Sequence, residues 1–243
     1  MSRVPDGPLI VGVADRAASL AACAAMPSRQ RPFDLVEARV DLFEGQRLDD
    51  QALESCQRLE STGTPVLVTI RSASQGGRFR DADPLRLVRF GEALQVASWA
   101  DIEDDAPIAA EVGRLVAERP FGQLVVSHHD FAGTPPLPDL LAVIDRCHAT
   151  SPGAIAKLAT AVTCDEDRTV LRTLLAQRPI RTAVIGMGDD GFRIELAAAG
   201  SRLAYGFVGA PTAPGQTSAE TLHARLVAAS PAYAARRGGS APT

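Results

Sequence analysis

The chain has 243 residues, of which 46% are hydrophobic and 22% are charged, as in an ordinary globular protein with a sizeable core. Its formal net charge of −4 provides no basic surface for nucleic acid or an anionic membrane, so neither is an expected partner. The sequence shows no apolar run of membrane-spanning length and no signal-peptide pattern, which predicts a cytoplasmic protein.

Short β-like runs alternate with amphipathic stretches along the chain. The predicted strands are residues 9–14, 35–41, 65–71, 99–105, 123–131, 154–162, 180–188 and 202–209. Helical periodicity is clearest in residues 49–62, 84–97, 138–149 and 165–177. Strand starts lie 22–34 residues apart, which is the length of one βα unit, and this alternation predicts a parallel sheet.

Eight such units in a chain of this length predict a (β/α)₈ TIM barrel. A doubly wound open sheet is the alternative, but the turn after the first strand, VADRAAS, lacks the glycine-rich phosphate loop of that fold. No shift in composition marks a second domain. We therefore expect one domain over residues 1–233, followed by a disordered tail, AARRGGSAPT, over residues 234–243.

The second predicted strand, LVEARVD, carries three charged residues at alternate positions. Glu37, Arg39 and Asp41 share one face of the strand, because side chains alternate between faces with a period of two. The other face packs against helices in a barrel, so the charges must point inward, where they need partners. Those partners are either a ligand or one another, and the second case would be a purely structural ion-pair network.

Two further strand ends carry candidate site residues. Arg71 precedes a Gly-Gly loop, where a guanidinium can hold an anionic or hydroxylated ligand, although a surface arginine is the simpler alternative. His128 and His129 are adjacent, so one faces inward and the other outward. Histidine is the usual acid/base near neutral pH. Metal binding is the weaker interpretation, since no companion ligands occur at a typical spacing, and no metal site is expected.

The sixth predicted strand, AIAKLATAV, contains Lys157, the only lysine among 25 basic residues. Drift toward arginine would explain the loss of the other lysines but leaves this one unexplained. Burial lowers the pKa of a lysine and frees its amine as a nucleophile, whereas arginine stays protonated. A snorkelling lysine at a strand end is the structural alternative. The retention of Lys157 favours Schiff-base chemistry on a carbonyl substrate.

Taken together, these segments resemble the type I 3-dehydroquinate dehydratases of the shikimate pathway. The resemblance runs in order over nearly the whole chain and rests on EARVD, TIRSASQGG, SHHDF, AKLA, MG at 187–188, GSRLAYG and the APGQ loop. It implies a TIM barrel that is often a homodimer, uses no metal or organic cofactor, and acts on a small molecule, 3-dehydroquinate.

The resemblance also implies roles for individual residues. Lys157 would form an imine with the C3 ketone, and His129, rather than His128, would take a C2 proton and assist loss of the C1 hydroxyl. Glu37 and Arg39 would bind substrate hydroxyls and orient His129. The remaining residues that would bind the substrate are Arg71, Met187, Arg193, Thr212 and Gln216.

This chain departs from the family pattern at two places. Gln75 stands where a carboxylate usually precedes the Gly-Gly pair, and its neutrality is expected to weaken proton handling or loop closure. At the carboxylate clamp, counting forward from MGxxG selects Glu195, whereas counting backward from GSxLxYG selects Arg193. We favour Arg193, because loops shorten more readily than the spacing of a packed helix changes.

Two other functions are consistent with the sequence. A Schiff-base enzyme of the same family with a substrate that lacks a carboxylate would suit Glu195 in the clamp. A non-catalytic protein that binds shikimate-pathway metabolites would need neither Lys157 nor His129, so their presence argues against it. The sequence does not distinguish biosynthesis from quinate catabolism.

Overall fold

The computed structural model describes residues 7–151, 153–209 and 217–237. Parallel strands form the wall of a barrel, and neighbours pair in the order β7-β6-β5-β4-β3-β2-β1-β8. The strands are β1 (Leu9–Ala14), β2 (Leu35–Arg39), β3 (Val66–Thr69), β4 (Trp99–Glu103), β5 (Gln123–Asp130), β6 (Ile155–Ala161), β7 (Thr182–Met187) and β8 (Leu203–Phe207).

The ring comes close to closing between β7 and β8, at the end where the strands begin. The Arg202 N–H donates to the Thr182 carbonyl at 2.9 Å. The Ser201 hydroxyl accepts from the Val184 N–H at 2.8 Å and donates to the Val184 carbonyl at 2.9 Å. This nearly closed ring confirms the predicted (β/α)₈ TIM barrel and excludes the open doubly wound sheet.

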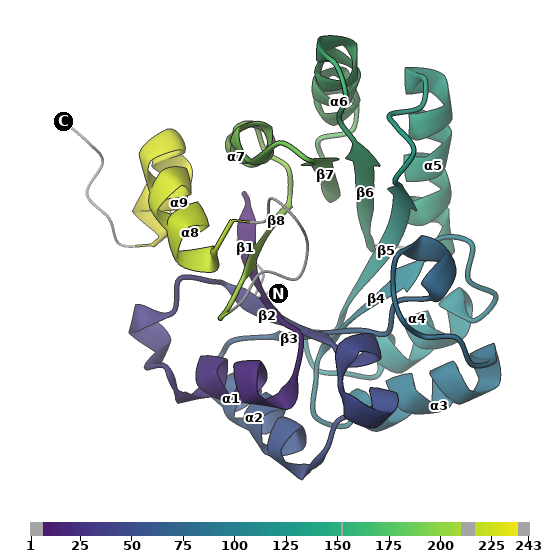
Figure 1. The fold of residues 1–243 in the computed structure, drawn as a ribbon, viewed down its shortest axis with the longest axis vertical. Helices are drawn as coiled ribbons and strands as arrows, with labels where there is room; N and C mark the ends of the chain where they lie inside the picture. Colours follow the sequence, from purple (N-terminus) through teal and green to yellow (C-terminus); the bar gives the residue numbers. More distant parts are fainter. Residues whose placement is uncertain (1–6, 152, 210–216, 238–243) are drawn as a thin grey trace.

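Helices surround the strands, as Figure 1 shows, and they follow one another around the barrel. They are α1 (Ala17–Ala25), α2 (Asp50–Ser61), α3 (Asp83–Ala93), α4 (Ala109–Ala117), α5 (Leu137–Thr150), α6 (Asp165–Gln177), α7 (Asp190–Ala198), α8 (Ala219–Ala229) and α9 (Pro231–Arg236). Ser218 caps α8 by accepting from the Thr221 N–H. In the described part of the chain, none of the helices has the length and apolarity needed to cross a membrane.

Two separate apolar clusters stabilise the barrel. The larger one lies between the helices and the outer faces of the strands. The smaller one fills the barrel interior near the starts of the strands and forms an apolar floor, which consists of Leu9, Val11, Leu35, Leu67, Trp99, Val125, Ile155, Ala183 and Leu203. Because side chains alternate along each strand, the next inward position on every strand lies directly above this floor.

The last helix extends past residue 233, where the sequence predicts the tail to begin. Helix α9 ends at Arg236, and Ala234 is fully buried. Arg236 and Arg237 both form ion pairs with Asp34, at 2.7 and 3.3 Å, which fasten this helix to the start of β2. The expected boundary is therefore too early, and residues 238–243 lie outside the described residues.

We predict that Gly206→Ala destabilises the barrel. A Cβ at Gly206 would lie 2.8 Å from the Ala219 Cα and N atoms, so β8 and the start of α8 would have to separate. Overpacking of this kind costs about 1–3 kcal/mol in the free energy of unfolding, measurable by urea denaturation. Gly91→Ala is the control: its Cβ meets nothing within 4 Å in the last turn of α3, so it should stabilise by about 0.5–1 kcal/mol. Equal effects of the two changes would contradict this packing argument.

Candidate active site

A layer of polar side chains lies directly above the apolar floor. Its members occupy the inward positions that follow the floor residues on six strands, and strand register places Thr69 beside Asp101 and Ser127 beside Lys157. All of them except the half-buried Tyr205 are buried. The layer consists of Glu37, Thr69, Asp101, Ser127, Lys157 and Tyr205.

Asp101 is the hub of this layer. Lys157 Nζ donates to Asp101 Oδ2 at 2.9 Å, while Arg71 and the Ser127 hydroxyl donate to Oδ1 at 2.7 and 2.6 Å. Burial alone would raise the pKa of Asp101, but the cations of Arg71 and Lys157 and the ring of His129 outweigh it and hold that pKa below its usual range. An ionised Asp101 therefore holds both Lys157 and Arg71 in position.

The surroundings of the Lys157 amine are less apolar than the apolar run of sequence around Lys157 suggests. Its neighbours Ala156 and Leu158 belong to the outer cluster, so the amine itself faces the polar interior. There it meets Asp101 and the ring of Tyr205, whose centroid lies 4.4 Å from Nζ. The Tyr205 hydroxyl is buried and has no hydrogen-bond partner among the described residues, and burial raises the pKa of this phenol well above its usual value.

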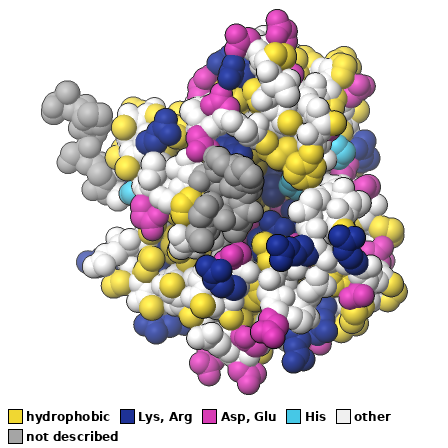
Figure 2. All heavy atoms as spheres, in the orientation of Figure 1, with side chains coloured by type: hydrophobic (Ala, Val, Ile, Leu, Met, Phe, Trp, Pro, Cys, Tyr) yellow, Lys and Arg dark blue, Asp and Glu magenta, His cyan; other side chains and the backbone are white. Residues whose placement is uncertain are grey.

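A cavity of about 750 Å³ opens above the polar layer, at the C-terminal ends of the strands. Figure 2 shows Lys and Arg side chains around a hollow in this face of the molecule. Basic side chains outnumber carboxylates in the lining, so an anionic small molecule would be attracted to it. The charged lining residues are Asp15, Arg16, Glu37, Arg39, Arg71, Arg78, Lys157 and Arg193.

The three charges predicted to face inward behave differently from one another. Strand β2 ends at Arg39, and Asp41 lies in the 3₁₀ turn that follows. Asp41 accepts two hydrogen bonds from Arg39, at 2.9 and 2.8 Å, and a third from the Arg78 N–H at 3.1 Å. This pair is structural and holds the Arg39 guanidinium at the rim of the cavity. Glu37 accepts from Thr69 at 2.7 Å and lines the cavity.

Arg71 lies just beyond the end of β3 and is buried, so its interpretation as a surface arginine is wrong. Besides Asp101, its guanidinium lies 3.3 Å from Glu103, which also pairs with the buried Arg86. The following loop folds back so closely that a Cβ at Gly77 would lie 2.0 Å from the Arg71 carbonyl oxygen. Only glycine fits there, because the loop passes directly against the Arg71 backbone.

The two adjacent histidines face opposite sides of β5, as strand alternation predicts. His129 lines the cavity, and its Nδ1 lies 3.2 Å from Gln75 Oε1. Burial, together with the charges of Arg71 and Lys157, lowers the pKa of His129 well below its usual value. His128 lies outside the barrel, where its Nδ1 is 3.0 Å from Asp104 Oδ1, and this hydrogen bond raises its pKa.

The two candidates for the clamp position also separate. Arg193 lines the cavity, and its Nε donates to the Gly186 carbonyl at 3.0 Å. Burial lowers the pKa of Arg193, because Asp190, 3.6 Å away, offsets only part of the lost hydration. Glu195 points away from the cavity, where it pairs with Arg172 of α6 and stays about half exposed (49%).

Of the other residues expected at the site, Met187 lines the cavity, while Thr212 and Gln216 lie outside the described residues. Glu37 was expected to orient the His129 ring, but it accepts a hydrogen bond from Thr69 instead. Among the described residues, Gln75 is the one that lies within hydrogen-bond distance of this ring.

Four residues of the site were not predicted from the sequence: Asp101, Glu103, Ser127 and Tyr205. The signal for the first two was present in WADIE, where Trp99, Asp101 and Glu103 alternate with apolar residues in the same way as the charges of the second strand. The described residues contain no group of three or more His, Cys, Asp or Glu side chains arranged to hold a metal ion.

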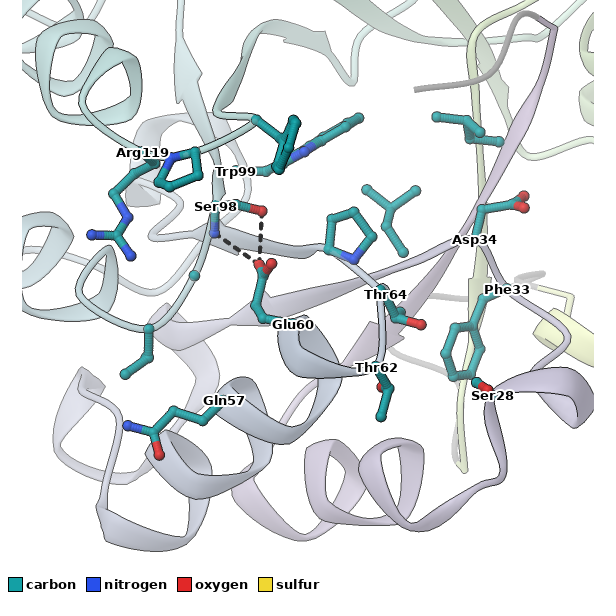
Figure 3. Close-up of a pocket in the computed structure, with 18 of the residues that line it drawn as sticks. Ser28, Phe33, Asp34, Gln57, Glu60, Thr62, Thr64, Ser98, Trp99 and Arg119 are labelled. Carbon is teal, nitrogen blue, oxygen red and sulfur yellow. Dashed lines mark hydrogen bonds between the residues drawn. The ribbon is translucent and has the colours of Figure 1, made fainter. Parts of the chain in front are cut away.

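A second cavity of about 720 Å³ lies at the opposite end of the barrel, beneath the floor residue Trp99. Figure 3 shows Glu60 at its centre, where Oε1 accepts from the Ser98 N–H at 2.8 Å and the Ser98 hydroxyl at 2.7 Å. The same oxygen accepts from the Val66 N–H at 2.8 Å. Glu60 thus joins the starts of β3 and β4. This end of a TIM barrel serves stability, so we assign the chemistry to the first cavity.

Comparison with known proteins points to one family. A family model described as Type I 3-dehydroquinase matches residues 11–230. A protein named 3-dehydroquinate dehydratase from Methanocella arvoryzae is 35% identical over 194 residues, which cover 78% of this chain and 84% of that protein. A protein of the same name from Thermococcus gammatolerans is 30% identical over 201 residues, covering 82% of this chain and 89% of that protein.

Solved structures give the same result. The crystal structure of 3-dehydroquinate dehydratase from Geobacillus kaustophilus superimposes with a TM-score of 0.72 at 26% identity, over 90% of each chain. That of the protein with this name from Aquifex aeolicus superimposes with a TM-score of 0.76 at 25% identity, over 89% of this chain and 96% of the other.

We predict that His128 stabilises the fold in a pH-dependent way. Because its hydrogen bond to Asp104 raises the folded-state pKa, this contribution is complete below the unfolded-state value near 6.5 and is lost as the pH rises through the folded-state value. The difference in unfolding free energy between the wild type and His128→Gln should therefore shrink from pH 6 to pH 9 in urea titrations. A difference that grows over this range would refute the assignment.

Proposed function

We propose that this chain, which belongs to the type I 3-dehydroquinase family, converts 3-dehydroquinate to 3-dehydroshikimate in the shikimate pathway through a Schiff base. The observation that carries the proposal is the single lysine, Lys157, at the base of an arginine-lined cavity that also contains His129. A lysine amine is the group that forms an imine with a ketone, and an imidazole can move the proton that dehydration requires.

In the first step, Lys157 releases a proton and its amine adds to the C3 carbonyl of the substrate. The released proton then leaves with the carbonyl oxygen as water, which gives an iminium. This cation draws electrons from the adjacent carbon and acidifies its C2 proton. Asp101 lies within hydrogen-bond distance of Nζ, and the face of the Tyr205 ring lies beside it, so both groups suit a positive charge on this nitrogen.

In the second step, His129 removes a C2 proton, and the resulting enamine expels the C1 hydroxyl. The proton on His129 passes to this leaving group, so water departs and the ring gains a double bond. Hydrolysis of the imine then releases 3-dehydroshikimate and restores the Lys157 amine. The low pKa of His129 keeps the ring neutral before the reaction, which is the state that a base requires.

Substrate binding falls to the other residues of the lining. Arg193 is the partner proposed for the substrate carboxylate, because its guanidinium lines the cavity and Asp190, 3.6 Å away, offsets only part of its lost hydration. Glu37, Arg39, Arg71 and Met187 would contact the ring and its hydroxyls. Thr212 and Gln216 remain expectations from the family resemblance.

The outward position of Glu195 removes the main support for a substrate without a carboxylate. A non-catalytic metabolite-binding protein is also less well supported, because Lys157 and His129 line the same cavity. We further propose a cytoplasmic location and a homodimer, as is common in the family, which light scattering on the purified protein would test.

The test of the function is direct. Addition of 3-dehydroquinate to the purified protein should produce 3-dehydroshikimate, whose conjugated double bond absorbs in the ultraviolet. A stoichiometric binding assay run in parallel would reveal a protein that binds the substrate without turning it over, and that result would contradict the proposal.

We predict that borohydride added together with substrate or product traps an adduct on Lys157 and inactivates the protein. Lys157 is the only lysine, so mass spectrometry of a proteolytic digest separates this adduct from modification of the N-terminal amine. Lys157→Arg should keep the charge beside Asp101 and the fold, yet abolish both trapping and turnover. Full activity after borohydride treatment, with unmodified protein, would rule out the Schiff base.

We predict that Arg193→Ala raises KM for 3-dehydroquinate and lowers kcat/KM by on the order of 10–100-fold, as expected for the loss of a charge-assisted hydrogen bond. The matched control is Glu195→Ala, which removes an exposed ion pair with Arg172 and should change kcat/KM by less than about twofold. If Glu195→Ala improves activity and Arg193→Ala is silent, the carboxylate clamp lies elsewhere.

A further inference from the structure

The amide of Gln75 has only one orientation that satisfies its neighbours. Its Nε2 donates to Asp105 Oδ1 at 2.9 Å, and a carboxylate offers acceptors for this contact, so the NH₂ end of the amide must face Asp105. The carbonyl end then faces His129. A rotated amide would set its oxygen against Asp105 and would turn its NH₂ group toward the His129 backbone N–H, so that two donors would face each other.

This orientation determines which nitrogen of His129 carries the proton. Gln75 Oε1 lies 3.2 Å from the His129 backbone N–H and 3.2 Å from Nδ1 of the ring. An amide oxygen can only accept hydrogen bonds, so Nδ1 must be the donor. In a neutral imidazole the other nitrogen, Nε2, then carries the lone pair.

The loop around Gln75 is built to hold the amide in place. Gln75 is buried, and its backbone N–H donates to the Ser72 carbonyl at 3.1 Å. The next residue, Gly76, has a positive φ of 79°, and a Cβ there would lie 2.5 Å from the ring of Phe131. That ring in turn stacks on His129 with a centroid separation of 6.2 Å. Gln75 and the imidazole are therefore packed as one unit.

We propose that Gln75, oriented by Asp105, is a positioning residue that selects the Nδ1–H tautomer of His129 and so provides Nε2 as the proton acceptor of the site. The tautomer is a property of the ligand-free protein. One part of the proposal rests on the proposed function, namely that Nε2 removes the substrate proton.

An amide at this position orients the ring without adding charge. The charged groups that act on His129 are the cations of Arg71, Lys157 and Arg39 and the carboxylate of Asp101. A carboxylate at position 75 would stabilise the imidazolium against these cations, whereas the amide leaves the ring neutral to lower pH. The sequence suggested that a neutral residue at position 75 weakens proton transfer. Under this proposal, Gln75 instead preserves the tautomer of His129 and lets the ring act as a base down to a lower pH.

The first test is the tautomer itself. The protein has four histidines, so ¹⁵N-labelled imidazoles can be assigned by comparison with His129→Gln. Long-range ¹H–¹⁵N correlation spectra of the ligand-free protein near pH 7.5 should show His129 neutral, with the proton on Nδ1 and a pyridine-type Nε2. A neutral His129 with its proton on Nε2 would overturn the proposal.

The second test exchanges the amide and the carboxylate. In Gln75→Glu/Asp105→Asn the new asparagine can donate to the new glutamate, so the hydrogen-bond chain is preserved while the charge moves next to His129. The pKa of His129 should rise by about one to two units, and the acidic limb of the kcat/KM profile should move to higher pH by the same amount. An unchanged His129 titration would overturn the proposal.

Asp105→Asn alone tests the orienting role. The introduced asparagine can accept as well as donate, so it no longer fixes the Gln75 amide, which is then held by the His129 backbone N–H, and a second tautomer of His129 should appear beside the first in the spectra. Asp104→Asn is the matched control, because it removes a neighbouring carboxylate that contacts His128 and should shift only that histidine. A single unchanged His129 tautomer in Asp105→Asn would contradict the proposal, even if the double variant failed to fold.

These outcomes are separable from the proposed function. If the spectra show the Nδ1–H tautomer and its response to Asp105→Asn while 3-dehydroquinate is not dehydrated, the proposed function fails and the tautomer assignment stands. If dehydration occurs but the proton lies on Nε2, the tautomer assignment fails and the proposed function stands.

Discussion

The buried carboxylate of Asp101 is the interaction on which the site depends. It lies on the interior of the barrel with no exposure, where an unpaired charge would be prohibitively costly. Its hydrogen-bond donors are Lys157 of β6, Ser127 of β5 and Arg71, which lies just beyond β3. The dependence is mutual, because removal of the carboxylate would take the ion-pair partner of the buried Lys157 and would leave Arg71 to pair with Glu103. Asp101 thus holds both the reacting amine of Lys157 and the guanidinium of Arg71 in position.

Strand alternation places this interaction in a polar layer directly above the apolar floor. On six of the strands an inward residue of the apolar floor is followed by one of the polar layer, so Trp99 is followed by Asp101, and Ile155 by Lys157. The floor separates the polar layer from water at the other end of the barrel, which strengthens every electrostatic contact within it. The cavity above the polar layer opens at the C-terminal face, where its lining is rich in basic side chains that suit an anionic ligand.

The sequence predicted those features that follow from periodicity within one element. The barrel, the inward face of Glu37 and Arg39, and the opposite directions of His128 and His129 all follow from a period of two, and α7 separates Arg193 from Glu195 because residues two apart in a helix diverge by about 200°. Contacts between loops could not be predicted in this way. Gln75 and Asp105 are 30 residues apart in segments without periodicity, and their hydrogen bond depends on how two loops fold over the barrel.

The two histidines of β5 show how the same side chain acquires opposite properties within one dipeptide. His128 meets the carboxylate of Asp104, which favours its charged form. His129 is half-buried beside the cations of Arg71 and Lys157, which favour its neutral form, and its ring meets an amide, which adds no charge. Both rings are oriented through Nδ1, so orientation does not distinguish them. What distinguishes them is the charge of the partner and of the surroundings, and it leaves His129 as the ring able to accept a proton at neutral pH.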